Sequence, residues 1–178
     1  SVLDPAFVER LPPADVVYSW GVLHHTGRMW DAIAAAASRI ALGGCFYLAI
    51  YNRAEEWRFH DDGSFGPSTF WVHEKRLYNA LPVPLQRGLE GVFVALWFGL
   101  TLLRGGNPYE EIRSHRQRTR GMSWIVDLRD WLGGYPYEFA SVDQVKAFCA
   151  ERLGLELRRL LPRSGTRNNE FLFRLPAP

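Results

Sequence analysis

The stretch Asp15–Thr26 reads Asp-Val-Val-Tyr-Ser-Trp-Gly-Val-Leu-His-His-Thr, and it decides the fold of the chain. Its first five residues contain a β-branched and aromatic run, Val-Val-Tyr, with two prolines before them and Gly21 after them, which predicts a short buried strand. Two adjacent histidines, His24 and His25, then follow on the turn that leaves the carboxyl end of this strand. In α/β sheets that end of a strand is where ligands bind.

The next residues complete a strand, helix, strand pattern. Apolar residues recur at helical spacing from Trp30 to Ala41, and the stretch 42–44 (Leu-Gly-Gly) is expected to end that helix. The following run, Cys45–Tyr51, is apolar throughout, which predicts a strand covered on both faces. Short connections between these elements predict a right-handed βαβ unit and therefore a parallel sheet.

Composition narrows the class of protein. The chain has 178 residues, 47% of them apolar, with a formal net charge of +2 and two cysteines. The low net charge argues against a nucleic-acid partner held by bulk electrostatics, and two cysteines in apolar segments indicate buried thiols. No signal-peptide pattern opens the chain, and the apolar run 89–103 is shorter than the ~20 residues of a bilayer span. We therefore expect a cytoplasmic protein.

The sequence divides into three segments that differ in residue composition and in their strand and helix patterns. Residues 1–52 carry the βαβ pattern and residues 121–178 return to regular strand and helix signals. Residues 53–120 between them are rich in aromatic and basic residues and are expected to form a mostly helical insertion. Insertions on such a scaffold usually determine specificity, so this one is expected to act as a lid over the ligand site or to bind the molecule that reacts there.

The last segment contains one strong local signal. Ser141 and Gln144 fit a capping box, so a helix is expected to begin there, and Gly154 is expected to end it. Two final strands are predicted at 155–161 and 170–175.

These elements resemble a known family. The first strand, the Val-Leu-His-His turn at 22–25, the helix and the Gly-Gly turn resemble the fourth-to-fifth-strand segment of class I S-adenosylmethionine-dependent methyltransferases. The family often has Lys-Pro where this chain has Ala41 and Leu42, and the resemblance does not explain the insertion. It implies the carboxyl-terminal half of a Rossmann-like α/β sheet, mostly parallel with one antiparallel strand, carrying a helical insertion.

The resemblance also implies a cofactor, S-adenosylmethionine. Leu3 and Asp4 match the loop after the family's third strand, where an acidic or amide residue accepts a hydrogen bond from the adenine amino group. Ser19, Trp20 and His24 match the floor beneath the methionine part of the cofactor. For Asp4 an ordinary helix cap is an open alternative.

Two family elements have no counterpart in this sequence. The glycine-rich cofactor loop and the acidic residue after the second strand are absent, and Gly-x-Gly occurs nowhere. We therefore expect the chain alone to bind the cofactor weakly or not at all and to be inactive. In the family the first strand lies beside the fourth, so Asp15–Ser19 is expected to be an open edge here. Such an edge predicts self-association or pairing with a partner chain.

Acceptor binding and catalysis are expected at the same rim. His25 is the candidate base because an unperturbed imidazole titrates near neutral pH, and a structural hydrogen bond from it to a backbone carbonyl is the open alternative. No metal site is expected, because adjacent histidines rarely face one ion and no third ligand stands at a usual spacing. The residues expected to contact the acceptor are Tyr51, Asn52, Trp71, Tyr78, Arg116 and Tyr135.

The implied function is methyl transfer from S-adenosylmethionine to a small or lipid-like acceptor. A non-catalytic binding or interaction module on the same scaffold is the alternative, in which the aromatic insertion binds a partner. A third possibility is contact with a membrane surface, because the apolar run 89–103 lies near a cluster of arginines between 113 and 120.

Overall fold

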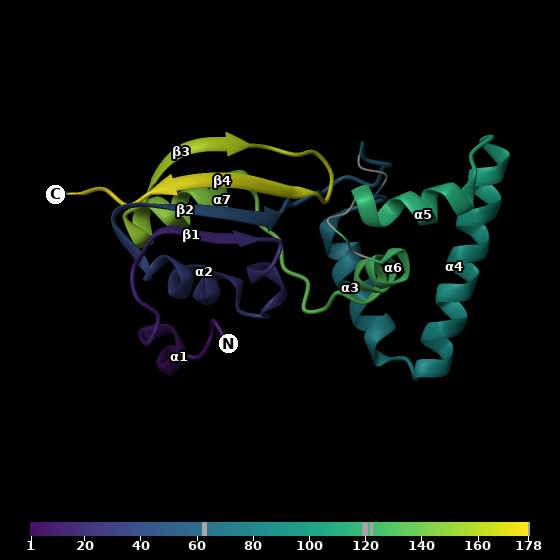
Figure 1. Cartoon of the computed structure of the whole chain (residues 1–178), viewed down its shortest axis with the longest axis horizontal. Helices are drawn as coiled ribbons and strands as arrows, with labels where there is room; N and C mark the ends of the chain where they lie inside the picture. The colour runs from purple at the N-terminus through teal and green to yellow at the C-terminus, as the bar shows by residue number, and fades with distance from the viewer. Residues whose placement is uncertain (62–63, 119–120, 122, 178) are drawn as a thin grey trace. The chain divides into compact units, whose positions relative to one another are not determined.

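A computed structural model describes residues 1–61, 64–118, 121 and 123–177. The chain forms two compact units (Figure 1). The first unit contains Ser1–Val72 and Pro136–Pro178, and the second contains His73–Tyr135. The second unit therefore begins and ends later in the sequence than residues 53–120, the insertion that residue composition predicted.

The first unit contains a four-stranded sheet in the order β1-β2-β4-β3. β1 runs parallel to β2, whereas β4 is antiparallel to both β2 and β3. Three strands therefore share one direction, and this is the mixed sheet, mostly parallel with one antiparallel strand, that the sequence predicts. Its elements are α1 (Pro5–Glu9), β1 (Ala14–Trp20), η1 (Leu23–His25), α2 (Met29–Ala37), β2 (Ile40–Tyr51), α7 (Val142–Ala147), the π-helical turn η2 (Phe148–Arg152), β3 (Glu156–Leu161) and β4 (Asn168–Arg174).

The core of the first unit lies on one face of this sheet (Figure 1). Alternate residues of β2 and β4, among them Phe46, Leu48 and Phe171, join one apolar cluster with Ile33 of α2 and Val145 of α7. Because side chains alternate across a strand, the residues between them face the other way. The helices thus bury one face of the sheet.

β1 is an edge strand, as expected, but it is not a buried one. Val16 and Tyr18 are each 63% exposed, and Tyr18 stacks on Tyr47 of β2 with ring centroids 5.4 Å apart. The prediction of a buried strand is therefore wrong for these two side chains, which belong to the face away from the core. Their apolar character reflects strand propensity rather than burial.

The Gly-Gly turn does not end a helix. α2 ends at Ala37, and residues 40–44 already belong to β2, which bulges there because Ala14 pairs with Ile40 while Val16 pairs with Cys45. Gly43 has φ +77° and its N–H donates to the Leu175 carbonyl. The glycines are therefore required by a bulge inside the strand, a role that the pattern on its own does not distinguish from a helix stop.

The helical signals near the carboxyl end are confirmed. Ser141 and Gln144 form both hydrogen bonds of a capping box, and Gly154, with φ +64°, follows the π-helical turn. Cys149 on that turn is buried, and burial raises the pKa of its thiol to about 12, whereas Cys45 is half-buried.

The second unit is helical. α3 (Ser68–Ala80) leads into it, and α4 (Val83–Leu103), α5 (Pro108–Arg118) and α6 (Trp124–Gly133) complete it. Its small core consists of Tyr78, Leu128 and Leu132. Among the described residues no single helix has the length and apolar composition of a membrane span, although α4 and α5, bent by 107°, pass that test together.

Glu90 is a buried carboxylate inside this unit. The Tyr78 hydroxyl donates to it at 2.9 Å, Arg129 lies 3.1 Å from its other oxygen, and Arg87 pairs with it as well. Burial alone would raise the pKa of Glu90, but these hydrogen bonds and charges outweigh burial and lower it. The carboxylate is thus stabilised in its ionised form.

We predict that Gly44→Ala destabilises the chain by about 2 kcal/mol, in the range of overpacked sites. A Cβ at this position would lie 2.9 Å from two backbone oxygens, those of Ala41 and Asp15, which cannot move aside cheaply. Gly91→Ala is the matched control, because a Cβ there meets open space on a helix and should stabilise by about 0.5–1 kcal/mol. Urea unfolding measures both, and equal stability of the two variants would contradict the close approach.

Candidate functional site

The two histidines lie on a single helical turn at the carboxyl end of β1. Gly21, with φ +69°, lets the chain leave the strand sharply, and its N–H still donates to the Ala49 carbonyl of β2. The turn η1 is then closed by Thr26, whose hydroxyl donates to the Leu23 carbonyl at 2.7 Å. The sequence therefore places both imidazoles at the rim where the parallel strands β1 and β2 end.

His24 is fully buried and electrically neutral. Its Nδ1 accepts a hydrogen bond from the Tyr51 N–H at 3.2 Å, and its ring stacks on the Tyr51 ring with centroids 3.9 Å apart. Burial, aided by the neighbouring His25, lowers the pKa of His24 to about 3. Because Nδ1 accepts, the proton of the neutral ring is on Nε2, which is buried without a hydrogen-bond partner among the described residues.

His25 is held by a hydrogen bond to the backbone of a different segment, at Pro136. Its Nδ1 lies 2.7 Å from the Pro136 carbonyl oxygen, and a carbonyl only accepts, so Nδ1 carries a proton. This is the structural hydrogen bond that the sequence left open as the alternative to catalysis. The same bond leaves the Nε2 lone pair of the neutral ring unprotonated, which is the arrangement of an oriented base.

The segment Pro136–Ala140 closes over the histidine turn. The Glu138 N–H donates to the His24 carbonyl at 2.9 Å, and the Tyr137 ring lies 4.9 Å from that of Tyr51. Residues 136–138 thus form a loop at this rim, and Gly133 is the last residue of α6.

Glu138 also caps the amino terminus of α2, a role that no sequence pattern indicated. α2 has no side-chain cap of its own, and both carboxylate oxygens of Glu138 accept from the Met29 N–H, at 3.0 and 3.2 Å. A carboxylate at a helix amino terminus is favoured by the helix dipole. The two partners are separated by 109 positions, so no local pattern relates them.

A polar cavity of about 470 Å³ lies beside the end of β2. Asn52, Arg53, Arg58, His60 and Ser141 are among the residues that line it. The Asn52 amide donates to a loop carbonyl at 2.9 Å and its oxygen accepts from Asn169 at 2.9 Å, so this side chain is fixed in place. The two arginines pair with neighbouring glutamates, which leaves the cavity with little net charge.

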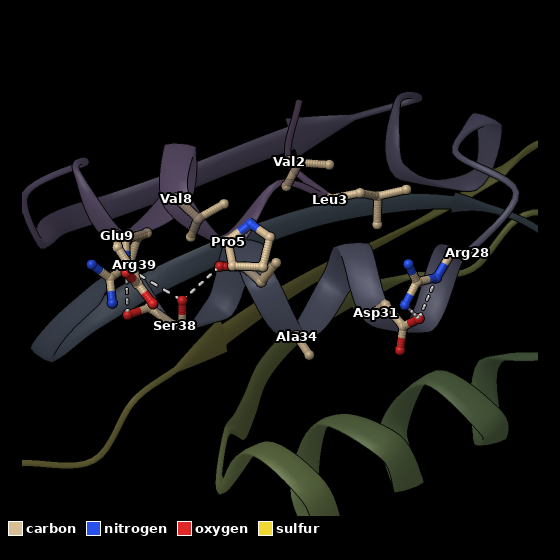
Figure 2. A pocket seen from close by; sticks show the side chains of 11 residues that line it. Val2, Leu3, Pro5, Val8, Glu9, Arg28, Asp31, Ala34, Ser38 and Arg39 are labelled. Atoms are coloured by element: carbon tan, nitrogen blue, oxygen red, sulfur yellow. Dashed lines mark hydrogen bonds and ion pairs between the residues drawn. The ribbon is translucent and has the colours of Figure 1, made fainter.

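A second cavity of about 440 Å³ lies between α1 and α2 (Figure 2). Leu3 lines it, as do Val8 and Ala34, with Arg28 paired to Asp31 at its margin. Asp4 does not line it. Its carboxylate caps α1 by accepting from the Ala6 N–H at 3.1 Å, which is the helix-cap role that the sequence left open.

The other expected cofactor residues lie on β1. Ser19 is buried, and its hydroxyl has no hydrogen-bond partner among the residues that the structure describes. Trp20 ends the strand and is half-buried. A buried hydroxyl usually has a partner, so Ser19 Oγ and His24 Nε2 are both atoms that a bound ligand or water would satisfy.

The expected acceptor residues fall in both units. Trp71 is half-buried on the first turns of α3, where its ring lies 5.3 Å from that of Phe70. Tyr78 is buried in the second unit with its hydroxyl committed to Glu90, while Arg116 and Tyr135 are exposed there. Across the described ranges no three His, Cys, Asp or Glu side chains gather closely enough to hold a metal ion.

No protein-family model matches the chain, and no curated protein matches it. Among solved structures it is similar to an O-methyltransferase family protein from Burkholderia thailandensis, with a TM-score of 0.46 and 13% sequence identity. The alignment covers 99% of this chain and 34% of that one, so this chain spans about a third of that protein's length. The function proposed below rests on the residues of the chain itself.

Replacing Glu138 by alanine should lower the free energy of unfolding by about 1–2 kcal/mol, because the buried Met29 loses the acceptor for its N–H. Glu138→Gln keeps an oxygen acceptor and should lose less than half of that. Glu156→Ala, which removes an exposed carboxylate of β3, is the control and should stay within about 0.5 kcal/mol. A loss for Glu138→Ala no larger than that of the control would rule out this capping role.

The low pKa of His24 makes stability depend on pH. The unfolded chain binds a proton at His24 below its ordinary pKa of 6.5, whereas the folded chain does not until about pH 3, so stability falls as the solution is acidified between these values. From pH 7 to pH 5 the loss from this residue should be about 2 kcal/mol. The difference between the wild-type chain and His24→Gln in urea unfolding at the two pH values isolates it, and parallel losses would contradict the assignment.

Proposed function

We propose that the chain carries the carboxyl-terminal part of an S-adenosylmethionine-dependent methyltransferase domain and helps to move a methyl group to a small or lipid-like acceptor. The observation that carries this proposal is the histidine turn. His24 and His25 stand where two parallel strands end, and the buried atoms Ser19 Oγ and His24 Nε2 have no partner among the described residues. The polar cavity begins at Asn52, the residue after Tyr51. This is the region of an α/β sheet where ligands bind.

In this proposal Ser19, Trp20 and His24 contact the methionine side of the cofactor. Ser19 Oγ and His24 Nε2 would hold its polar groups. Trp20 is the last residue of β1 and lies on the opposite face from Ser19, so it would contact the cofactor only around the end of the strand. S-adenosylmethionine supplies, when bound, a methyl group on a positively charged sulfur. On the adenine side, Leu3 lines the cavity beside α1, while one oxygen of Asp4 already accepts from that helix.

In this proposal His25 takes the proton that the acceptor loses. The hydrogen bond from Nδ1 to the Pro136 carbonyl fixes the ring and its tautomer, so that Nε2 is the nitrogen that can accept. Methyl transfer needs little from the protein beyond positioning and proton removal. Tyr51 and Asn52, at the end of β2 and beside the polar cavity, would bind the acceptor.

We further propose that another polypeptide strand pairs with β1, and the two edges of the sheet differ in a way that supports this. β3, at one edge, carries Glu156, Arg158 and Arg159, charges that discourage pairing. β1, at the other edge, has only Asp15 as a charged residue and exposes Val16 and other apolar groups. A strand paired here, from a second copy or from a different chain, would cover that edge.

Weak binding of S-adenosylhomocysteine tests the cofactor assignment. In a ¹H–¹⁵N NMR titration at millimolar ligand, we expect the amide signals of Ser19 and His24 and the indole signal of Trp20 to shift together. Ser19→Val should weaken this binding about fivefold to tenfold, the value of one lost hydrogen bond.

Tyr18→Phe is the control, because the Tyr18 side chain is exposed on the other face of β1 and should not change the affinity. If no signal around the histidine turn shifts at millimolar ligand, the cofactor assignment fails. A non-catalytic module on this scaffold is then the better description.

A further inference from the structure

One face of α4 is apolar along most of its length and is not covered by any of the residues that the structure describes. We call it the outward face of α4, and it consists of Leu85, Leu89, Val92, Leu96, Leu100 and Leu103, which recur every three or four residues. Each of these side chains is about half exposed or more, from 48% for Leu89 to 85% for Leu103. Single exposed leucines are normal, but a contiguous row of this extent marks an interaction surface.

The opposite side of α4 is already committed. It holds Glu90, buried and bonded to Tyr78 and Arg129, together with buried Thr101, while Phe93 packs against the core of the second unit. α4 therefore cannot rotate to bury its outward face within the unit without exposing this network. The same network rules out surrounding the whole helix with lipid, because an ionised carboxylate would then lie in hydrocarbon.

Three exposed arginines of the second unit can add attraction to an anionic surface. α4 has only two charged residues, Arg87 and Glu90, and both belong to the buried network rather than to the outward face. Arg104 follows directly on Leu103, and Arg113 and Arg116 lie on α5. All three are exposed and form no ion pair among the residues that the structure describes.

We propose that the outward face of α4 docks on the surface of an anionic lipid bilayer, with the helix lying in the plane of the interface. The leucines would enter the boundary of headgroups and acyl chains, while Arg104 and the arginines of α5 approach lipid phosphates. This docking uses no residue of the histidine turn, so it stands independently of methyl transfer.

A bilayer fits this face better than a second copy of the chain does. Protein interfaces carry about one hydrogen bond per 100–200 Å² and a polar rim. The outward face offers neither, because its backbone groups are bonded within the helix and its side chains are all hydrocarbon. Between the leucines, a Cβ added at Gly88 or Gly91 would meet no atom within 4 Å outside the helix backbone, so none of the described residues shields the face there.

Co-sedimentation with sucrose-loaded vesicles tests the proposal. The full chain should bind vesicles of phosphatidylcholine with phosphatidylglycerol at least about tenfold more tightly than phosphatidylcholine alone, since each arginine near the surface contributes about fivefold. The double variant Leu89→Gln/Leu96→Gln should lose binding to both by at least about tenfold. The double variant Arg104→Gln/Arg116→Gln should lose binding only to the vesicles that contain phosphatidylglycerol. Its binding to phosphatidylcholine vesicles should equal that of the wild type.

Leu77→Gln on α3 is the matched control, because Leu77 is 66% exposed in the same unit but lies off α4 and should bind as the wild type does. Circular dichroism establishes that each variant is folded. The proposal is overturned if the folded wild-type chain binds neither vesicle or if Leu89→Gln/Leu96→Gln binds undiminished. It is also overturned if light scattering finds a dimer that this variant dissociates while no chain binds vesicles, since the occupant is then a second copy.

Discussion

The hydrogen bond from the Tyr51 N–H to His24 Nδ1 ties the ends of the two parallel strands together. It makes Nδ1 of His24 an acceptor, so the ring must stay neutral, and burial enforces this by lowering the pKa of His24 to about 3. With His24 fixed, its carbonyl receives the Glu138 N–H, and His25 reaches the Pro136 carbonyl. The positions of His25 and of the segment at Glu138 therefore depend on one buried, uncharged imidazole.

Local patterns predicted the elements of the first unit well. The capping box at Ser141, the glycine that ends the helix and the two final strands are all properties of a few neighbouring residues, and the structure confirms them. The role of Gly43 was missed because a bulge and a helix stop both need a positive φ, and only the pairing partner of the strand distinguishes them. Glu138 was missed as a cap because its partner, the Met29 N–H, is distant in sequence and close only in the fold.

The candidate site could be predicted only in part, again because local patterns do not show contacts between residues that are distant in sequence. Position along β1 placed the histidines at the rim, but whether Asp4 binds a ligand or caps α1 depends on how the chain turns after it, and the structure shows the cap. Tyr78 illustrates the opposite case. Its aromatic ring suggested a binding wall, but its hydroxyl is needed to stabilise Glu90, a contact that arises only when α3 and α4 pack.

The charged residues of β3 have a consequence for symmetry. If β1 of one molecule paired with β3 of the next, each addition would leave the same two edges free, and the sheet would grow without limit into a fibre. Glu156, Arg158 and Arg159 oppose that head-to-tail contact. Pairing of β1 with another β1, by contrast, uses up both open edges at once. The distribution of charge between two strands thus permits a closed assembly and disfavours an endless one.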